Sequence, residues 1–222
     1  MHHGDPARGD APLRWTPPPV TRRGWLAWWR GESGYREVLQ LAWPLFFSYG
    51  SATILQFVDR MFLTWYSPEA MAATAPAGML AFTVQSLFIG LVGYAATFVA
   101  QYTGADRPRQ AVAVVWQALY LSVLGALLVL PLAPAGGAIF RLAGHTAELQ
   151  ALEQPFFAIF VYGSFPFIAG AALSAYFIGR GQTRVVLWVN LTAVAINIVL
   201  DYLLIFGMWG APRLGVVGAA LG

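Results

Sequence analysis

The chain has 222 residues, of which 58% are hydrophobic and only 10% are charged, with a formal net charge of +3. Such a composition excludes a single soluble domain and indicates an all-α, polytopic membrane protein. Cys is absent, which excludes disulfides, thiol catalysis and Cys-based metal sites. The basic residues, all Arg, occur in short loops, where they orient a protein in the bilayer, so we expect no nucleic-acid partner.

Residues 1–35 are predicted to form a cytoplasmic tail and an interfacial helix before a transmembrane lobe, residues 36–222. The first 24 residues are polar and rich in Pro, Gly and Arg, which is typical of a disordered tail. They lack the apolar stretch of a secretory signal. Trp25, Trp28 and Trp29 have helical spacing and Arg neighbours, which predicts a short helix at the membrane surface. Two His residues in the tail do not indicate a metal site, and none is predicted.

Five apolar segments are long enough to cross a bilayer, since about 20 residues suffice. They cover residues 38–65, 71–102, 111–132, 152–178 and 185–209. Pro44 should kink the first, and Pro155 and Pro166 should break the fourth. We expect a polar loop at residues 136–150, with His145 in solvent. A sixth segment begins at residue 214 and is too short to span, so we expect a truncated form of a longer protein.

Two carboxylates lie inside predicted spans, Asp59 in the first and Asp201 in the fifth. Asn197 lies one helical turn before Asp201, and Asn190 lies about three turns before Asp201, so these side chains share one face. A carboxylate in hydrocarbon is costly and therefore indicates function. The alternative is a structural polar contact between helices. Arg60 follows Asp59 directly but points about 100° away from it on the helix.

A second polar surface is predicted along the first and second spans. Gln56 shares a narrow face with Asp59, and the second span carries a stripe of small and polar residues. The predicted cavity-lining residues are Gln56, Thr83, Ser86, Thr97 and Asn190. The stripe favours either close helix packing or the wall of an aqueous cavity, and both readings stay open.

The Arg distribution predicts a cytoplasmic N-terminus, because ten Arg residues fall on the side of the tail and two on the other. The first and fifth spans then both run outward. Asp59 lies roughly 21 residues into the first span and Asp201 roughly 16 into the fifth, which places both in the outer half of the membrane. Two acids at similar depth can share or relay a cation.

Several motifs occur in an order and spacing that match one family from about residue 36 to the end. They are Leu41-Ala42-Trp43-Pro44, Phe57-Val58-Asp59, Val99-Ala100-Gln101 with Gly104-Ala105, Gly179 to Arg184, Asn197 to Gly207, and Gly215 to Ala220. With these motifs the chain resembles the multidrug and toxic compound extrusion (MATE) family of cation antiporters. The sequence around Asn197 and Asp201 resembles that of the DinF-like branch of this family.

The resemblance implies twelve helices in two six-helix lobes, of which this chain supplies the N-terminal one: five full spans and the start of the sixth. It implies efflux of lipophilic or cationic compounds in exchange for H⁺, or for Na⁺, without a cofactor and without enzymatic activity. The implied coupling residues are Asp59, Asn197 and Asp201. The implied partners are the bilayer of the inner membrane, the substrates and the missing C-terminal lobe.

Three alternatives were weighed. A lipid or lipid-linked oligosaccharide flippase of the same superfamily would carry more basic residues on its membrane faces, where only Arg60 occurs. An intramembrane aspartyl protease would carry a Gly-x-Gly-Asp turn, which is absent. A natural half-size protein that dimerises disagrees with the incomplete sixth segment.

Overall fold

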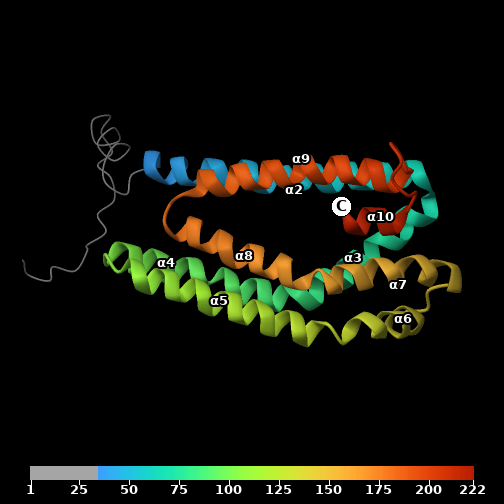
Figure 1. Cartoon of the computed structure of the whole chain (residues 1–222), viewed down its shortest axis with the longest axis horizontal. Helices are drawn as coiled ribbons and strands as arrows, with labels where there is room; N and C mark the ends of the chain where they lie inside the picture. Colours follow the sequence, from blue (N-terminus) through green and yellow to red (C-terminus); the bar gives the residue numbers. More distant parts are fainter. Residues whose placement is uncertain (1–34) are drawn as a thin grey trace, which may run out of the picture. The chain divides into compact units, whose positions relative to one another are not determined.

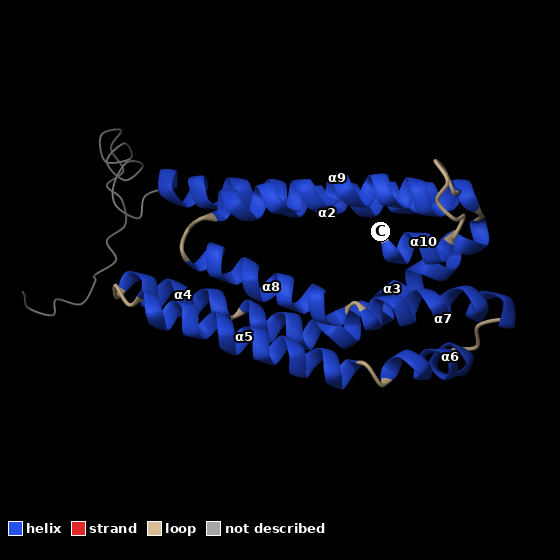
Figure 2. Cartoon of the chain, in the orientation of Figure 1, coloured by secondary structure: helices blue, strands red, loops and turns tan. Residues whose placement is uncertain are grey.

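The structure, a computed structural model, describes residues 35–222. Residues 35–40 belong to a unit that covers Met1–Gln40, and Leu41–Gly222 form a second compact unit, which is described here by itself. The predicted interfacial helix at Trp25–Trp29 lies outside the described residues. Every regular element of the described part is a helix, which confirms the all-α fold class (Figure 2).

The helices follow one another with short connections (Figure 1). They are α2 (Tyr35–Tyr66), α3 (Pro68–Gly93), α4 (Ala95–Gly104), α5 (Pro108–Val129), α6 (Leu132–Leu142), α7 (Ala147–Tyr162), α8 (Ser164–Gly179), α9 (Thr183–Phe206) and α10 (Val216–Leu221).

Four helical segments of the described residues are long and apolar enough to cross a membrane: Val38–Tyr66, Pro68–Gly104, Pro108–Val129 and Thr183–Phe206. The second joins α3 to α4. α7 and α8 make a fifth if the bent pair counts as one span. α2 passes through Pro44 as one continuous helix.

The predicted polar loop at residues 136–150 was wrong, because α6 occupies much of it. The sequence here is apolar and rich in Ala, and Pro134 lies in the first turn of α6, where a missing N–H breaks no helical hydrogen bond. α7 then begins after Thr146, whose side chain accepts a hydrogen bond from the backbone N–H of Leu149.

The break in the fourth span occurs at Gly163, where α7 and α8 meet at 47°. Pro155 lies inside α7 and does not end it, contrary to the prediction. Pro166 lies in the first turn of α8, and its ring removes the N–H that would bond the carbonyl of Tyr162. The amide of Gln85 in α3 donates to the carbonyl of Phe160 and to the hydroxyl of Ser164, both 2.8 Å away. Gln85 therefore braces the bend.

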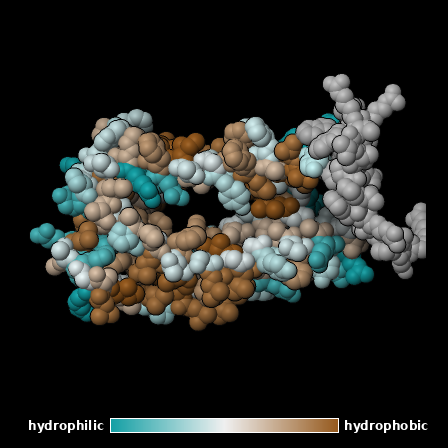
Figure 3. All heavy atoms as spheres, turned by 180° about the vertical axis from the view of Figure 1, so that it is seen from behind, coloured by the Kyte–Doolittle hydropathy of each residue, from teal (hydrophilic) through white to brown (hydrophobic). Residues whose placement is uncertain are grey.

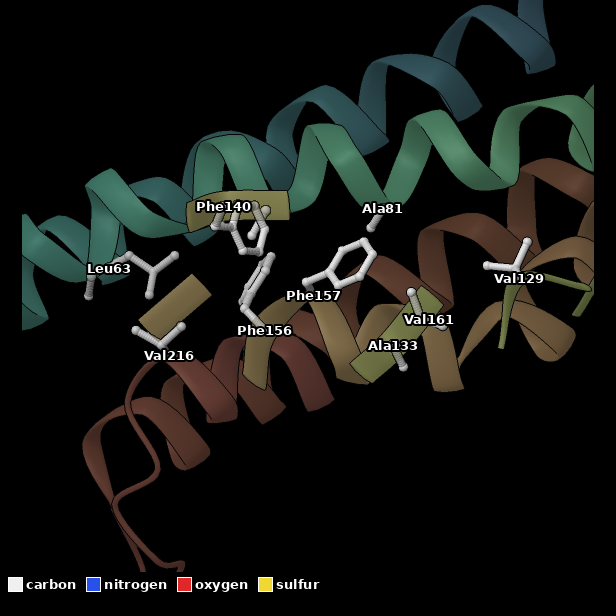
Figure 4. Packing of buried hydrophobic residues seen from close by; sticks show 11 residues of the cluster. Leu63, Ala81, Val129, Ala133, Phe140, Phe156, Phe157, Val161 and Val216 are labelled. Atoms are coloured by element: carbon white, nitrogen blue, oxygen red, sulfur yellow. The ribbon is translucent and has the colours of Figure 1, made fainter. Parts of the chain in front are cut away.

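The main core cluster lies where α3, α6 and α7 meet, with Phe157 fully buried at its centre (Figure 4). Phe140 of α6 packs edge-on against Phe157, with ring centroids 5.9 Å apart. A second cluster of mostly small residues joins α3, α4, α5 and α8. Small residues allow helices in a membrane to approach closely, which strengthens their van der Waals packing.

Many large apolar side chains are exposed on the outer surface, as expected of a protein that faces lipid (Figure 3). The same space-filling view shows an opening between the α2–α9 pair and α8. α10 packs against α9 and α7 at one end of this opening.

Candidate cation-coupling site

Two parallel helices, α2 and α9, carry the candidate site (Figure 1). Most of their residues are apolar, so the polar side chains that lie between them stand out. Phe62 of α2 packs against Tyr202 and Phe206 of α9, with ring centroids 5.8 and 5.9 Å away. This aromatic contact lies just beyond the two predicted acids in both helices.

The structure brings Asp59 and Asp201 together, since their carboxyl groups are close enough to interact directly. Asp201 is only 1% exposed and Asp59 is half-buried. Oδ1 of Asp59 and both carboxylate oxygens of Asp201 are buried without a donor among the described residues. Buried oxygens without donors are costly, and two facing carboxylates repel each other unless a proton or another cation lies between them.

Asn197 adds a further acceptor to this site. It lies one turn before Asp201, and its Oδ1 is also buried without a donor among the described residues. Asn197 and Asp201 thus carry acceptor oxygens on one face of α9, and the carboxyl group of Asp201 lies next to that of Asp59 in α2. Carboxylate and carbonyl oxygens suit hard cations, whereas no group of three His, Cys, Asp or Glu that could hold a metal occurs in residues 35–222.

α10 closes one side of the acid pair. A side chain added at Gly222 would collide with Oδ1 of Asp201, and one added at Gly218 would lie 2.6 Å from the backbone of Leu204. The two glycines are four residues apart, so both face α9. Glycine is needed here because any Cβ would separate α10 from α9 and uncover Asp201.

The predicted cavity-lining residues do not gather at the acid pair. Gln56, Thr83 and Thr97 are exposed, and Ser86 is half-buried. The hydroxyls of Thr83 and Ser86 donate to carbonyls of their own helix. Asn190 instead bridges the two helices, because its amide donates to the hydroxyl of Ser48.

Two polar clusters were missed by the sequence analysis. The first is the Gln85–Ser164 brace of the bend. The second is a buried acid, Glu153 in α7, which is fully buried and lies 2.6 Å from Nδ1 of His145. The prediction of a solvated His145 was wrong. An acid within an apolar segment, eight positions after a His, was the available signal.

Comparison with known proteins assigns the chain to a family. The sequence profile of the MatE family matches residues 44–203. The probable multidrug resistance protein NorM of Bacillus subtilis (strain 168) is 28% identical over 189 residues, which cover 84% of this chain and 41% of that protein. The protein of the same name from Synechocystis sp. (strain ATCC 27184 / PCC 6803 / Kazusa) is 29% identical over 190 residues, with coverage of 84% and 40%.

Solved structures share the fold. A MOP superfamily transporter from Pyrococcus furiosus superposes with a TM-score of 0.78 at 22% identity, over 88% of this chain and 42% of that one. An outward-facing multidrug resistance MATE family transporter gives a TM-score of 0.78 at 22% identity, over 88% and 43%. The chain spans about two fifths of the length of these relatives. Because the family profile covers most of the chain, this protein belongs to the MatE family of membrane transporters.

Proposed function

We propose that this chain forms the cation-coupling lobe of a multidrug efflux antiporter. The observation that carries the proposal is the contact between Asp59 and Asp201, whose buried oxygens lack donors. Such a pair binds a cation strongly and releases it when the surroundings change. The relatives named as multidrug resistance proteins support efflux as the activity, and lipid flipping has no comparable support.

In this proposal the pair takes up H⁺ from the outer side and substrate leaves. Uptake of one proton removes the repulsion between the facing carboxyl groups and supplies the missing donor. Asn197 can accept a hydrogen bond from a protonated acid or donate one to a carboxylate, so it stabilises both states. The exchanged compounds are lipophilic or cationic, and Na⁺ is the alternative coupling ion. The protein lies in the inner membrane in this proposal. Its N-terminus faces the cytoplasm, as the distribution of Arg residues predicts.

Asp201→Asn tests the proposal, because the amide keeps the size of the side chain but no longer titrates. The full-length protein is reconstituted into liposomes, and dye efflux is followed under an imposed pH gradient and, separately, an imposed Na⁺ gradient. We expect Asp201→Asn to insert normally and lose gradient-driven efflux, and Asp59→Asn to lose or weaken it. The gradient that drives the wild-type protein identifies the ion. Efflux by Asp201→Asn at the wild-type rate would place the coupling site elsewhere.

A further inference from the structure

A second polar contact joins the two helices of the site. The side-chain amide of Asn190 in α9 donates to the hydroxyl of Ser48 in α2. Ser48 is 2% exposed and Asn190 is half-buried. Asn190 is therefore bound to a neighbouring helix through its side-chain amide.

The position of this contact repeats that of the acid pair. Asp59 follows Ser48 by eleven positions, and Asp201 follows Asn190 by eleven. Eleven residues turn an α-helix about 20° beyond three full turns and advance it by roughly 16 Å. Both contacts thus lie on the same faces of two parallel helices, and each joins residues 142 positions apart.

The aromatic contact between α2 and α9 restricts the axial position of the two helices less than this hydrogen bond does. The Phe62 ring meets Tyr202 and Phe206 at tilted or edge-on angles, and ring pairs of this kind tolerate centroid distances from about 4.5 to 7 Å. A hydrogen bond requires a donor and an acceptor within a narrow range of distance and angle. Sliding α2 by one turn along α9 would break the Ser48–Asn190 hydrogen bond and, in the same movement, separate the two carboxyl groups.

We propose that Ser48 and Asn190 are positioning residues, whose hydrogen bond fixes the axial register of α2 against α9 and so holds Asp59 opposite Asp201. The consequence of this hydrogen bond for transport rests on the proposed function, whereas its effect on the register of the two helices does not. Both residues lie about three helical turns before the acid pair.

The chain offers a matched control in Ser51. It lies in the same helix, is 5% exposed, and its hydroxyl donates to the carbonyl of Ser48, within α2. Ser51→Ala removes a buried hydroxyl at nearly the same depth without removing a contact to α9. Ser48→Thr keeps the hydroxyl, and the double change Ser48→Asn with Asn190→Ser exchanges the two partners.

Register is measured by cross-linking, since residues 1–222 contain no Cys that could compete with an introduced pair. Asp59→Cys and Asp201→Cys are introduced together into the full-length protein in membranes and treated with a short bifunctional thiol reagent. Ser48→Ala and Asn190→Ala should each slow cross-linking, by up to about threefold, because loss of an interhelical hydrogen bond in a membrane shifts the equilibrium between registers by about that factor. Ser51→Ala and Ser48→Thr should leave the rate unchanged, and the exchanged pair should restore it.

Efflux is measured with both acids intact. Under a positioning role, the variants that slow cross-linking should lower efflux and shift its pH profile, and the exchanged pair should recover both. Unchanged cross-linking in Ser48→Ala and Asn190→Ala, or an equal loss in Ser51→Ala, overturns the proposal. The two proposals can fail independently. Efflux by Asp201→Asn tests the proposed function, whereas cross-linking tests the register of the helices.

Discussion

Three acids of the described helices lie in largely apolar surroundings, and they have different partners. Glu153 is paired with His145, a group that can carry positive charge or donate a proton. Asp59 and Asp201 have only each other, although each is an acceptor when ionised. A paired acid is suited to a permanent structural contact, whereas two facing acids require an exchangeable cation. This contrast separates Glu153 from the coupling site.

Glu153→Ala should destabilise the protein by about 1–3 kcal/mol, since it leaves His145 without its partner and opens space in the core beside Phe157. Glu148→Ala is the control, because Glu148 lies in the same helix and is exposed. It should change stability by no more than about 0.5 kcal/mol. Thermal unfolding of the detergent-solubilised protein measures both. Equal midpoints for the two variants would show that the Glu153–His145 pair is not structural.

Asp201→Asn should stabilise the protein while it abolishes coupling. The amide supplies a donor to Asp59, where the native pair has two acceptors, and a hydrogen bond contributes about 0.5–1.5 kcal/mol. The gain should be clearest at alkaline pH without Na⁺, when the fewest carboxyl groups carry a cation. Asp201→Ala, which supplies no donor, should not be stabilised. A lower unfolding midpoint for Asp201→Asn than for the wild type under these conditions contradicts the idea that the acids repel each other.

At the scale of elements, the short helix α10 depends on close contact with α9. Gly218 faces the backbone of Leu204, which cannot rotate away as a side chain can. Gly207 ends α9 in the left-handed conformation (φ 71°), and the turn that follows leads the chain back to Gly218. The packing of α10 against α9 therefore brings Gly222 next to Asp201.

Gly218→Ala should cost about 1–3 kcal/mol, because the added methyl group overlaps the α9 backbone and must push α10 outward. Gly170→Ala is the control, since nothing lies within 4 Å of a Cβ at that position of α8. Its effect should be neutral, or stabilising by about 0.5–1 kcal/mol, as for Gly to Ala inside a helix. Thermal midpoints of the two variants compare them directly. A Gly218→Ala protein as stable as Gly170→Ala would mean that α10 is not held against α9.

At the scale of the whole molecule, the proposed orientation can be tested with single Cys residues in this Cys-free chain. Arg107→Cys lies in the exposed turn between α4 and α5, on the predicted cytoplasmic side. It should react with membrane-impermeant thiol reagents only after cells are opened. Arg141→Cys, exposed near the end of α6, should react in intact cells. Labelling of position 107 in intact cells would reverse the topology.

These 222 residues alone are not expected to transport, since they correspond to about two fifths of each relative. Alternating access in carriers built from repeats moves one repeat against the other around a site between them. A single lobe lacks the second surface. Drug resistance of cells that express residues 1–222 at normal levels, compared with cells that express the Asp201→Asn variant, would contradict this expectation.

The sequence by itself determined the all-α membrane class, most long helices and the identity of both acids. These follow from long apolar runs and from the cost of a carboxylate in hydrocarbon, which are properties of single segments. Similar depth for Asp59 and Asp201, in the outer half of the membrane, was predicted by counting residues along two spans. The contact between their carboxyl groups agrees with that count.

Only the tertiary structure decided which polar groups meet. The role of Asn190 depends on Ser48, which lies 142 positions away in the chain, and spacing along one helix cannot show that the two side chains meet. His145 was predicted to lie in solvent because the segment that contains α6 was predicted to be a loop, and Glu153 was not predicted to have a role. Only the packing of α6 on α7 brings the two side chains together. Helix periodicity tells which face a residue occupies, but the partner of that face depends on how distant helices pack.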